Sequence, residues 1–247
     1  MPIFDAHFHV IDPGFPIREN RGYLPPPFTI EDYRARTDGL EVSGGAVVSA
    51  AFQYFDQSYL YAALERLGPG FVGVTQLAPS ATDAEIHALA DAGVRGLRFN
   101  MVGGVQDVDD MVAVGRRVAD LVDWHVELHC HAMQLPALAP RLVGLRVIVD
   151  HLGLRAEGLP DLLRLVDGGI RVKASGFGRT DLDVPDALRA ITAIDPSALM
   201  FGSDLPSTRS PPQPFSHDDV QLIRDTLGER LAQRVLYDNA AAFYRIM

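Results

Sequence analysis

Short apolar runs and amphipathic segments alternate along the whole chain, which is typical of repeated β-α units. The apolar runs predict eight strands, each rich in Val, Ile, Leu or Phe. They fall at residues 3–9, 45–53, 71–77, 94–99, 125–130, 145–150, 170–175 and 198–202. Between the strands, apolar residues recur at spacings of three and four, as from Val108 to Val122, and describe one face of a helix. The pattern predicts an α/β fold.

Several of the predicted helices begin with a recognisable cap, in which Ser or Thr precedes an acidic residue by three positions. The capping pairs are Thr29 with Asp32, Thr82 with Glu85, and Ser216 with Asp219. The last stretch, from Glu229 to Ile246, reads as a terminal helix. We expect it to close the bottom or the flank of a barrel.

The length of 247 residues matches the roughly 250 residues of a (β/α)8 barrel, the TIM barrel. No linker divides the chain, because the proline-rich segment 24–27 is short and comes too early to separate two cores. We therefore predict one barrel domain over residues 1–247.

The formal net charge of -10 disfavours nucleic acid and anionic membranes as partners, since both require a basic surface. The single cysteine, Cys130, excludes an internal disulfide and suits a reducing compartment. The N-terminus lacks a basic region followed by an apolar run, and no segment has the eighteen or so apolar residues that span a bilayer. We expect a cytoplasmic protein that acts on a small molecule. A homo-oligomer is compatible with the sequence.

The first strand contains the most informative segment, residues 3–10. Its even positions are apolar, and alternation would place Asp5, His7 and His9 on one face. Two imidazoles side by side at a strand end are suited to a metal ion. The alternative is a solvent-facing edge strand whose histidines have no function.

Reactive side chains also follow the other strands, where the active site of such a barrel lies. His87, His125 and His217 are exceptions that do not follow a predicted strand, and we expect them to be solvated. The residues at strand ends are His7, His9, Gln53, Arg98, Asn100, His129, His131, Asp150, His151, Lys173, Ser175, Arg179 and Asp204.

In order, the chain has His-x-His on the first strand, His on the fifth, DHLG at 150–153, KASG at 173–176 and GSDLP at 202–206. This set resembles the amidohydrolase superfamily. More narrowly it is similar to the amidohydrolase-2 branch, which includes pyrone-dicarboxylate lactonase and zinc-dependent decarboxylases of the aminocarboxymuconate type. The resemblance implies a (β/α)8 barrel. It also implies that His7, His9, His129 and Asp204 are metal ligands, with His151 as a catalytic histidine that binds no metal.

The chemistry of these residues agrees with such roles. Three imidazoles and a carboxylate leave room for water on a divalent ion, with Zn²⁺ the first expectation and Mn²⁺ or Fe²⁺ also compatible. Asp204 would touch the ion or accept a proton from water, and His151 would act as an acid or base. As alternatives, Asp204 would cap a helix, and His151 would be a core histidine bonded to backbone.

The fifth strand leaves one choice open. His129 and His131 lie on the same strand face, so spacing alone does not decide between them as the ligand. We favour His129, because His131 falls one step further into the loop. Cys130 points the other way and is expected to be a buried thiol against the helices.

Arg98 and Arg179 at a barrel mouth suggest a small anionic substrate, since guanidinium groups bind carboxylates through paired donors. We expect Gln53 and Asn100 to line the same substrate site. The lactonase has a further arginine after its RFN segment, whereas this chain has Met-Val-Gly-Gly at 101–104. A mono-anionic lactone or ring-opened acid therefore fits better than a dicarboxylate. In the alternative, each arginine pairs with a barrel carboxylate such as Glu127.

We thus predict a metal-dependent hydrolase of a small anionic carbonyl compound, foremost a lactone. A decarboxylase of a small unsaturated acid would use the same metal site. A non-catalytic barrel that binds a ligand is the third alternative, and fold analogy does not choose among them.

Overall fold

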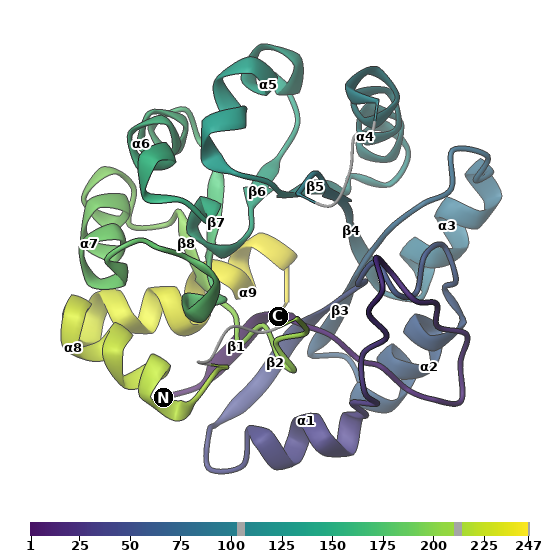
Figure 1. Ribbon diagram of the computed structural model, residues 1–247, viewed down its shortest axis with the longest axis horizontal. Coiled ribbons are helices and arrows are strands. Elements are labelled where there is room, and N and C mark those ends of the chain that lie inside the picture. Colours follow the sequence, from purple (N-terminus) through teal and green to yellow (C-terminus); the bar gives the residue numbers. More distant parts are fainter. Residues whose placement is uncertain (103–106, 210–213, 247) are drawn as a thin grey trace.

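The computed structural model describes residues 1–102, 107–209 and 214–246, and within them eight parallel strands follow one another around a barrel (Figure 1). The strands are β1 Ile3–Phe8, β2 Val42–Val48, β3 Phe71–Thr75, β4 Val94–Asn100, β5 His125–His129, β6 Val147–Val149, β7 Arg171–Ala174 and β8 Leu199–Phe201. Each strand pairs with the next in the chain. The eight predicted strands and the (β/α)8 fold are confirmed. The second strand is shorter than predicted and ends at Val48, so Gln53 lies in the following turn.

The ring is closed between its first and last strands just beyond the end of β8. The backbone N–H of Asp204 donates to the carbonyl of His7 over 2.7 Å, and the N–H of His9 donates to the carbonyl of Leu205 over 2.8 Å. These two bonds place the residues after β8 directly beside the end of β1.

Helices surround the ring of strands, as Figure 1 shows. They are α1 Ile30–Arg36, α2 Ser58–Leu67, α3 Asp83–Asp91, α4 Val108–Val122, α5 Leu135–Leu142, α6 Leu159–Asp167, α7 Val184–Ile194, α8 His217–Gln233 and α9 Asn239–Tyr244. All three predicted capping boxes are present, at the starts of α1, α3 and α8. Among the helices of the described chain, none is long and apolar enough to cross a membrane.

The C-terminal segment closes one end of the barrel, as predicted. The backbone of α8 breaks at Gly228, whose φ of 70° is in the left-handed region, and the chain then stays helical through a π turn, η5 Arg234–Asp238, into α9. The ring of Tyr244 on α9 stacks on Phe4 of β1, with ring centroids 5.4 Å apart. Because Phe4 lies near the start of its strand, α9 covers the N-terminal end and leaves the other end for the site.

Two hydrophobic layers flank the strands. The larger one lies between strands and helices and includes Cys130, so the prediction of a buried thiol against the helices is confirmed. Burial raises the pKa of this thiol to about 12. The smaller layer fills the barrel interior. It consists of Phe4, Ala6, Ala46, Val48, Val72, Val74, Ile148, Met200, Ala240 and Tyr244.

A register shift in β1 between Asp5 and Phe8 corrects one prediction. Three residues of β1 there span only two of β2, which is a β-bulge, and the simple alternation of side chains is lost. The Asp5 carboxylate accepts hydrogen bonds from the Tyr33 hydroxyl of α1 at 3.0 Å and from the Ser203 hydroxyl at 2.6 Å. The expectation that Asp5 shares one face with His7 and His9 is therefore wrong.

Candidate metal centre and active site

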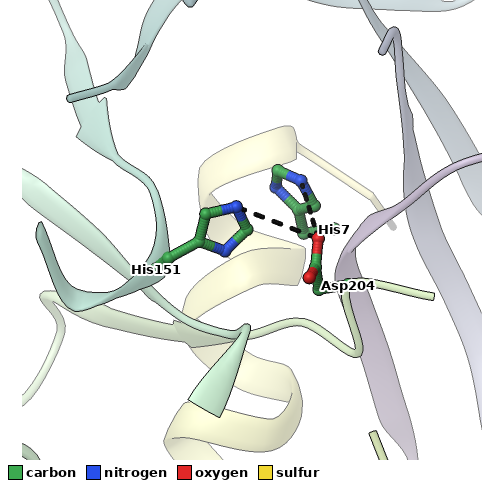
Figure 2. Close-up of side chains that lie close together, drawn as sticks. All are labelled: His7, His151 and Asp204. Carbon is green, nitrogen blue, oxygen red and sulfur yellow. Dashed lines mark ion pairs between the residues drawn. The ribbon is translucent and has the colours of Figure 1, made fainter. Parts of the chain in front are cut away.

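The C-terminal ends of β1, β6 and β8 bring four side chains together, which we call the mouth cluster: His7, His9, His151 and Asp204. Each is at most 4 % exposed, so the alternative of a solvent-facing edge strand is excluded. The His7 ring centroid lies 5.1 Å from that of His9 and 4.8 Å from that of His151. Figure 2 shows the His7 and His151 rings directed at Asp204.

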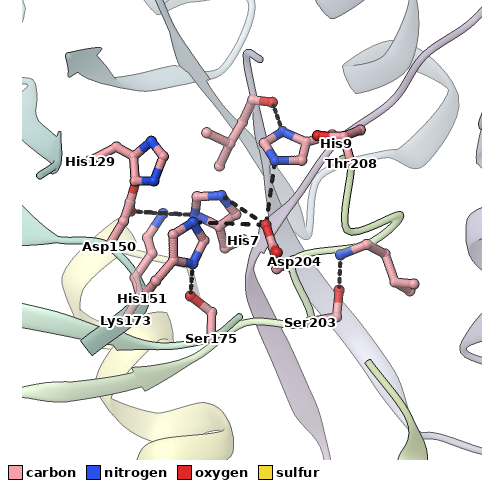
Figure 3. Close-up of polar contacts among 12 residues, drawn as sticks. His7, His9, His129, Asp150, His151, Lys173, Ser175, Ser203, Asp204 and Thr208 are labelled. Atoms are coloured by element: carbon pink, nitrogen blue, oxygen red, sulfur yellow. Dashed lines mark hydrogen bonds and ion pairs between the residues drawn. The ribbon is translucent and has the colours of Figure 1, made fainter. Parts of the chain in front are cut away.

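One carboxylate oxygen is the centre of the mouth cluster. The Oδ1 atom of Asp204 lies 3.6 Å from Nε2 of His9, 3.8 Å from Nε2 of His151 and 3.9 Å from Nε2 of His7 (Figure 3). Among the described residues, this Oδ1 and the Nε2 of His7 have no hydrogen-bond partner although both are buried. Unpartnered buried polar atoms are uncommon and indicate that a further group belongs between them.

The tautomer of His9 identifies the charge of that missing group. Nδ1 of His9 lies 2.7 Å from the backbone carbonyl of Val48, which only accepts, so Nδ1 carries the hydrogen. In the neutral ring Nε2 then carries a lone pair and is an acceptor. It faces the carboxylate of Asp204, which is also an acceptor. Two acceptors face each other stably only with a cation or a proton between them.

The backbone at the ends of β6 and β8 is unusual for non-glycine residues. His151 and Asp204 have φ values of 52° and 57°. Left-handed conformations of this kind are uncommon outside glycine and are frequent at functional sites. His151 begins the short helix η2, His151–Gly153, and its Nδ1 lies 2.9 Å from Ser175 Oγ. Since this partner is a side chain, the alternative of a histidine bonded to backbone is not what the structure shows.

Two glycines make room for the histidines. A Cβ at Gly176 would lie 2.7 Å from Nδ1 of His151, and a Cβ at Gly202 would lie 2.6 Å from Cβ of His7. Real Cβ atoms do not approach that closely, so both positions in the KASG and GSDLP motifs require glycine for the rings to sit where they do.

Arg179 anchors Asp204. Its Nε donates to Oδ2 of Asp204 and its second amino group donates to the carbonyl of Thr208 over 2.8 Å. Asp204 does not cap any of the described helices, which removes that alternative. Because Arg179 takes Oδ2, only Oδ1 of Asp204 is available to the mouth cluster.

Two further predicted substrate-binding side chains, Arg98 and Gln53, also have partners inside the protein. Arg98 donates through Nε to Oδ2 of Asp150 over 2.9 Å and is 4 % exposed. Gln53 donates to the carbonyl of Val10 over 2.9 Å. The alternative that the arginines pair with barrel carboxylates is thus correct in kind, although the partners are Asp150 and Asp204 and not Glu127.

His129 lies beside the mouth cluster and His131 does not join it. The His129 ring centroid is 5.2 Å from that of His151, and its Nδ1 is 3.1 Å from Oδ1 of Asn100. His131 instead caps the short helix η1, Ala132–Gln134, where its N–H donates to the Gln134 side chain. Of the two histidines that the sequence left open, His129 is the one near the candidate site.

Burial sets the protonation of the mouth cluster. It lowers the pKa of His7 to about 4 and that of His151 to about 3, so both rings are uncharged at neutral pH. For Asp204 burial alone would raise the pKa, but the neighbouring His151 and Arg179 outweigh it and hold the pKa well below 3.8. His7 and His151 therefore offer neutral imidazoles and Asp204 an ionised carboxylate, the forms in which these residues bind metal ions.

The donor set can be tested against a divalent cation. One ligand atom each from His7, His151 and Asp204 lies within 4.8 Å of the others, and all three residues are buried. With Nε2 of His7 and Oδ1 of Asp204 unpartnered, these residues fit a cation at this point. Nitrogen and oxygen donors of this type suit zinc, manganese and iron alike.

A second buried group lies deeper in the barrel and was not assigned a function from the sequence. We call it the lysine cluster: Glu127, Asp150 and Lys173, all 0 % exposed. Nζ of Lys173 is 2.6 Å from Oε1 of Glu127 and 4.0 Å from Oδ1 of Asp150. The signal was available, because Glu127 and Lys173 are charged residues within strands and Asp150 directly follows one, and a buried charge there needs a partner across the barrel.

His125 is a further correction. It was expected to be solvated, but it is the first residue of β5, is 1 % exposed, and lies 3.1 Å from Oε1 of Glu127. Exposed positions for His87 and His217 are confirmed. Gly103 and Gly104, part of the segment that departs from the lactonase pattern, lie outside the described residues, as do positions 210–213 in the loop after β8.

Comparison with known proteins gives consistent matches. The family model described as amidohydrolase matches residues 4–246. A 2-pyrone-4,6-dicarboxylate hydrolase of Comamonas testosteroni is 35 % identical over 170 residues, which cover 66 % of this chain and about half, 54 %, of that protein. A 4-sulfomuconolactone hydrolase of Rhizobium radiobacter is 28 % identical over 99 % of this chain and 90 % of its own length.

Among solved structures, a Pseudomonas putida protein provisionally named 2-pyrone-4,6-dicarboxylic acid hydrolase superimposes with a TM-score of 0.85 at 28 % identity. The match covers 98 % of this chain and 97 % of that one. The barrel and its order of strands are thus shared along the whole length.

Proposed function

Since the chain belongs to the amidohydrolase family, we propose that it is a metal-dependent hydrolase of a small anionic lactone. The observation that carries the proposal is the unpartnered Oδ1 of Asp204, which faces three imidazole nitrogens at the open end of the barrel. The relatives that are named as lactone hydrolases support the substrate class.

We assign His7, His9, His129 and Asp204 as the metal ligands and His151 as a catalytic residue that binds no metal. The tautomers support this division. Nδ1 of His9 donates to a carbonyl and Nδ1 of His129 faces the amide oxygen of Asn100, so both rings present a lone pair at Nε2. The Ser175 hydroxyl beside His151 can donate as well as accept, so Nε2 of His151 is able to carry a hydrogen.

A bound divalent ion, zinc first, would polarise the lactone carbonyl and lower the pKa of a water ligand to about 7. The protein side chains supply the proton transfers. Asp204 acts through Oδ1, first as a ligand and then as the acceptor of a proton from water, because Arg179 already takes its other oxygen. His151, which is uncharged at neutral pH, donates a hydrogen bond from Nε2 to the developing oxyanion, and the proton held at Asp204 passes to the leaving ring oxygen. Burial excludes bulk water and strengthens each of these interactions.

The anionic group of the substrate would bind near Arg98 and Arg179, with Gln53 and Asn100 at the same end of the barrel. Both arginines have carboxylate partners, so each pairing is close to neutral and leaves only part of its donor fork for the substrate. This supports a mono-anionic lactone. A cytoplasmic location, which fits the single thiol, completes the proposal.

Metal analysis and product analysis test the proposal together. The purified protein should contain about one divalent ion, and a chelator should abolish hydrolysis of a panel of carboxylated lactones that added Zn²⁺ restores. Ring opening should consume water without release of carbon dioxide. Release of carbon dioxide from an unsaturated acid would instead assign a decarboxylase, and binding of the panel without turnover would assign a ligand-binding barrel.

The ligand assignment has its own test. His129→Asn should lower the zinc content, whereas His151→Asn should retain zinc and lose turnover by about 10²- to 10³-fold, the range for loss of one oxyanion donor. If zinc were lost in His151→Asn and retained in His129→Asn, His151 would be the metal ligand in place of His129. The distance of 3.8 Å between His151 and Asp204 allows this result.

A further inference from the structure

His7 is the residue that links the two buried clusters, because its two ring nitrogens face different groups. Nε2 faces Asp204 in the mouth cluster at 3.9 Å. Nδ1 faces the lysine cluster, with Nζ of Lys173 at 3.3 Å and Oδ1 of Asp150 at 3.4 Å (Figure 3). All of these side chains are at most 1 % exposed, so bulk water does not replace either neighbour.

These two neighbours of Nδ1 require opposite tautomers. An ammonium group only donates, so a bond from Lys173 would put the ring hydrogen on Nε2, where it would block a metal ion. An ionised carboxylate only accepts, so a bond to Asp150 puts the hydrogen on Nδ1 and leaves a lone pair at Nε2. The competition at Nδ1 thus decides what His7 presents to the mouth cluster.

The partners of the competitors favour Asp150. Lys173 already has a close acceptor in Oε1 of Glu127 at 2.6 Å. Oδ2 of Asp150 accepts from Arg98, but its Oδ1 has no other hydrogen-bond partner among the described residues. A bond from Lys173 to His7 would leave Oδ1 of Asp150 unpaired, and an Nε2 hydrogen would lie too far from Asp204 to bond. A bond from His7 to Asp150 satisfies Oδ1 and leaves two lone pairs that one cation satisfies.

We infer that Asp150 is a positioning residue that holds the hydrogen of His7 on Nδ1 and so prepares Nε2 to bind the metal ion. Lys173 balances the charge of this carboxylate, and its closest contact is with Glu127 at 2.6 Å, shorter than the 3.3 Å to His7. The inference rests on the proposed function only in taking His7 as a metal ligand. The tautomer itself is a property of the protein with or without metal.

Asp150→Asn is the decisive variant because Arg98 fixes how its amide must lie. The Nε–H of Arg98 needs an acceptor, so the amide oxygen faces Arg98 and the amide NH₂ faces His7. Both neighbours of Nδ1 are then donors, and the hydrogen of His7 moves to Nε2. The shape of the side chain is unchanged.

Nitrogen-15 NMR of protein with labelled histidine reads the tautomer directly, and His7→Gln identifies the signal. We expect the hydrogen on Nδ1 in the wild type and on Nε2 in Asp150→Asn. Chelator competition with Zn²⁺ should show a 10- to 100-fold loss of affinity in the same variant, as for other outer partners of metal-binding histidines. The double variant Glu127→Gln/Lys173→Met is the matched control. It removes Lys173, the competing donor, and leaves the net charge of the protein unchanged. His7 should therefore keep its Nδ1 hydrogen, and zinc affinity should change less than threefold.

A hydrogen on Nε2 of His7 in the wild type would overturn the inference, whether or not Asp150→Asn folds. An unchanged tautomer in a folded Asp150→Asn would overturn it as well. If the wild type bound no divalent ion and opened no lactone, the proposed function would fail, while the NMR result would still decide the role of Asp150.

Discussion

The mouth cluster and the lysine cluster each contain at least one buried carboxylate, but they differ in the cation beside it. His7 lies next to both, because donor atoms of His7, His151 and Asp204, and likewise of His7, Glu127 and Asp150, lie within 4.8 Å of one another. In the lysine cluster the ammonium of Lys173 lies among these atoms. In the mouth cluster three imidazole nitrogens face Oδ1 of Asp204, and among the described residues no cationic side chain bonds to that oxygen.

The difference distinguishes buried carboxylate oxygens that stabilise the fold from those that are available to a ligand. Oε1 of Glu127 has three donors, from Lys173 at 2.6 Å and from His125 and Tyr244 at 3.1 Å each. Among the described residues, Oε1 of Glu127 is thus satisfied by the protein, whereas Oε2 of Glu127 and Oδ1 of Asp204 have no donor. Each carboxylate is paired at one oxygen, Glu127 with Lys173 and Asp204 with Arg179. The free oxygen of Asp204 faces three imidazole nitrogens, so we take it as the one that the fold leaves to a ligand.

The largest expected effect is at Asp204. Asp204→Asn keeps the shape but removes the charge that faces the imidazoles, so zinc binding should weaken and kcat/KM for lactone hydrolysis should fall by about 10³-fold or more. The measurement is steady-state kinetics with metal analysis of the same samples. Asp186→Asn, an exposed carboxylate on α7, is the control and should retain activity. Full activity in Asp204→Asn would contradict the assignment of Asp204 to the metal site.

The next effect is on stability, at Glu127. Glu127→Gln leaves the ammonium of Lys173 buried with its nearest remaining carboxylate oxygen 4.0 Å away, on Asp150. Removal of one partner of a buried ion pair costs about 3–5 kcal/mol, so the free energy of unfolding in urea should fall by that amount. Glu127→Gln/Lys173→Met should recover most of it, because no unpaired charge then remains. Equal losses in the single and double variants would contradict a pairing role.

Prediction from sequence succeeded where the signal was local. Apolar runs located all eight strands, and capping residues located the helix starts, because both depend on neighbours within a few positions. Most of the mouth cluster was also predicted, since side chains that follow parallel strands of a barrel meet at one end.

The failures came from features that depend on distant residues. Alternation in β1 is broken by a bulge, so Asp5 turned to Tyr33 and Ser203. His125 was expected to be solvated, but it is covered by Tyr244 of α9, more than a hundred residues later in the chain. The local sequence gives no sign of that contact. The partners of Arg98 and Lys173 lie across the barrel, and a single sequence gives no spacing that identifies them.

Tyr244→Phe sharpens the comparison with a smaller change in the lysine cluster. It removes the hydroxyl that donates to Glu127 over 3.1 Å and keeps the ring that stacks on Phe4. A hydrogen bond to a charged group contributes about 1.5–3 kcal/mol, so we expect a loss near 2 kcal/mol in urea unfolding. Lactone hydrolysis should be retained, because the hydroxyl bonds to Oε1 of Glu127 and not to the mouth cluster. A loss of activity without a loss of stability would mean that the two clusters are coupled through Glu127.

The smallest effect concerns His125 and appears only as pH falls. Burial lowers the pKa of His125 below 6.5 in the folded protein, and nearby Lys173 acts in the same direction, against a smaller opposing effect of Glu127. The unfolded chain therefore takes up a proton first as pH drops, so the stabilisation is complete above pH 6.5 and is lost as pH falls toward the folded pKa. One group of this kind changes the free energy of unfolding by at most about 1.4 kcal/mol per pH unit.

Urea unfolding between pH 7.5 and about 5 tests this prediction. The free energy of unfolding should depend less steeply on pH in His125→Gln, whose amide still donates to Glu127, than in the wild type. His87→Gln on the exposed face of α3 should give a curve parallel to the wild type. If His125→Gln were also parallel, His125 would carry its charge in the folded barrel, and the lysine cluster would hold a second cation beside Lys173.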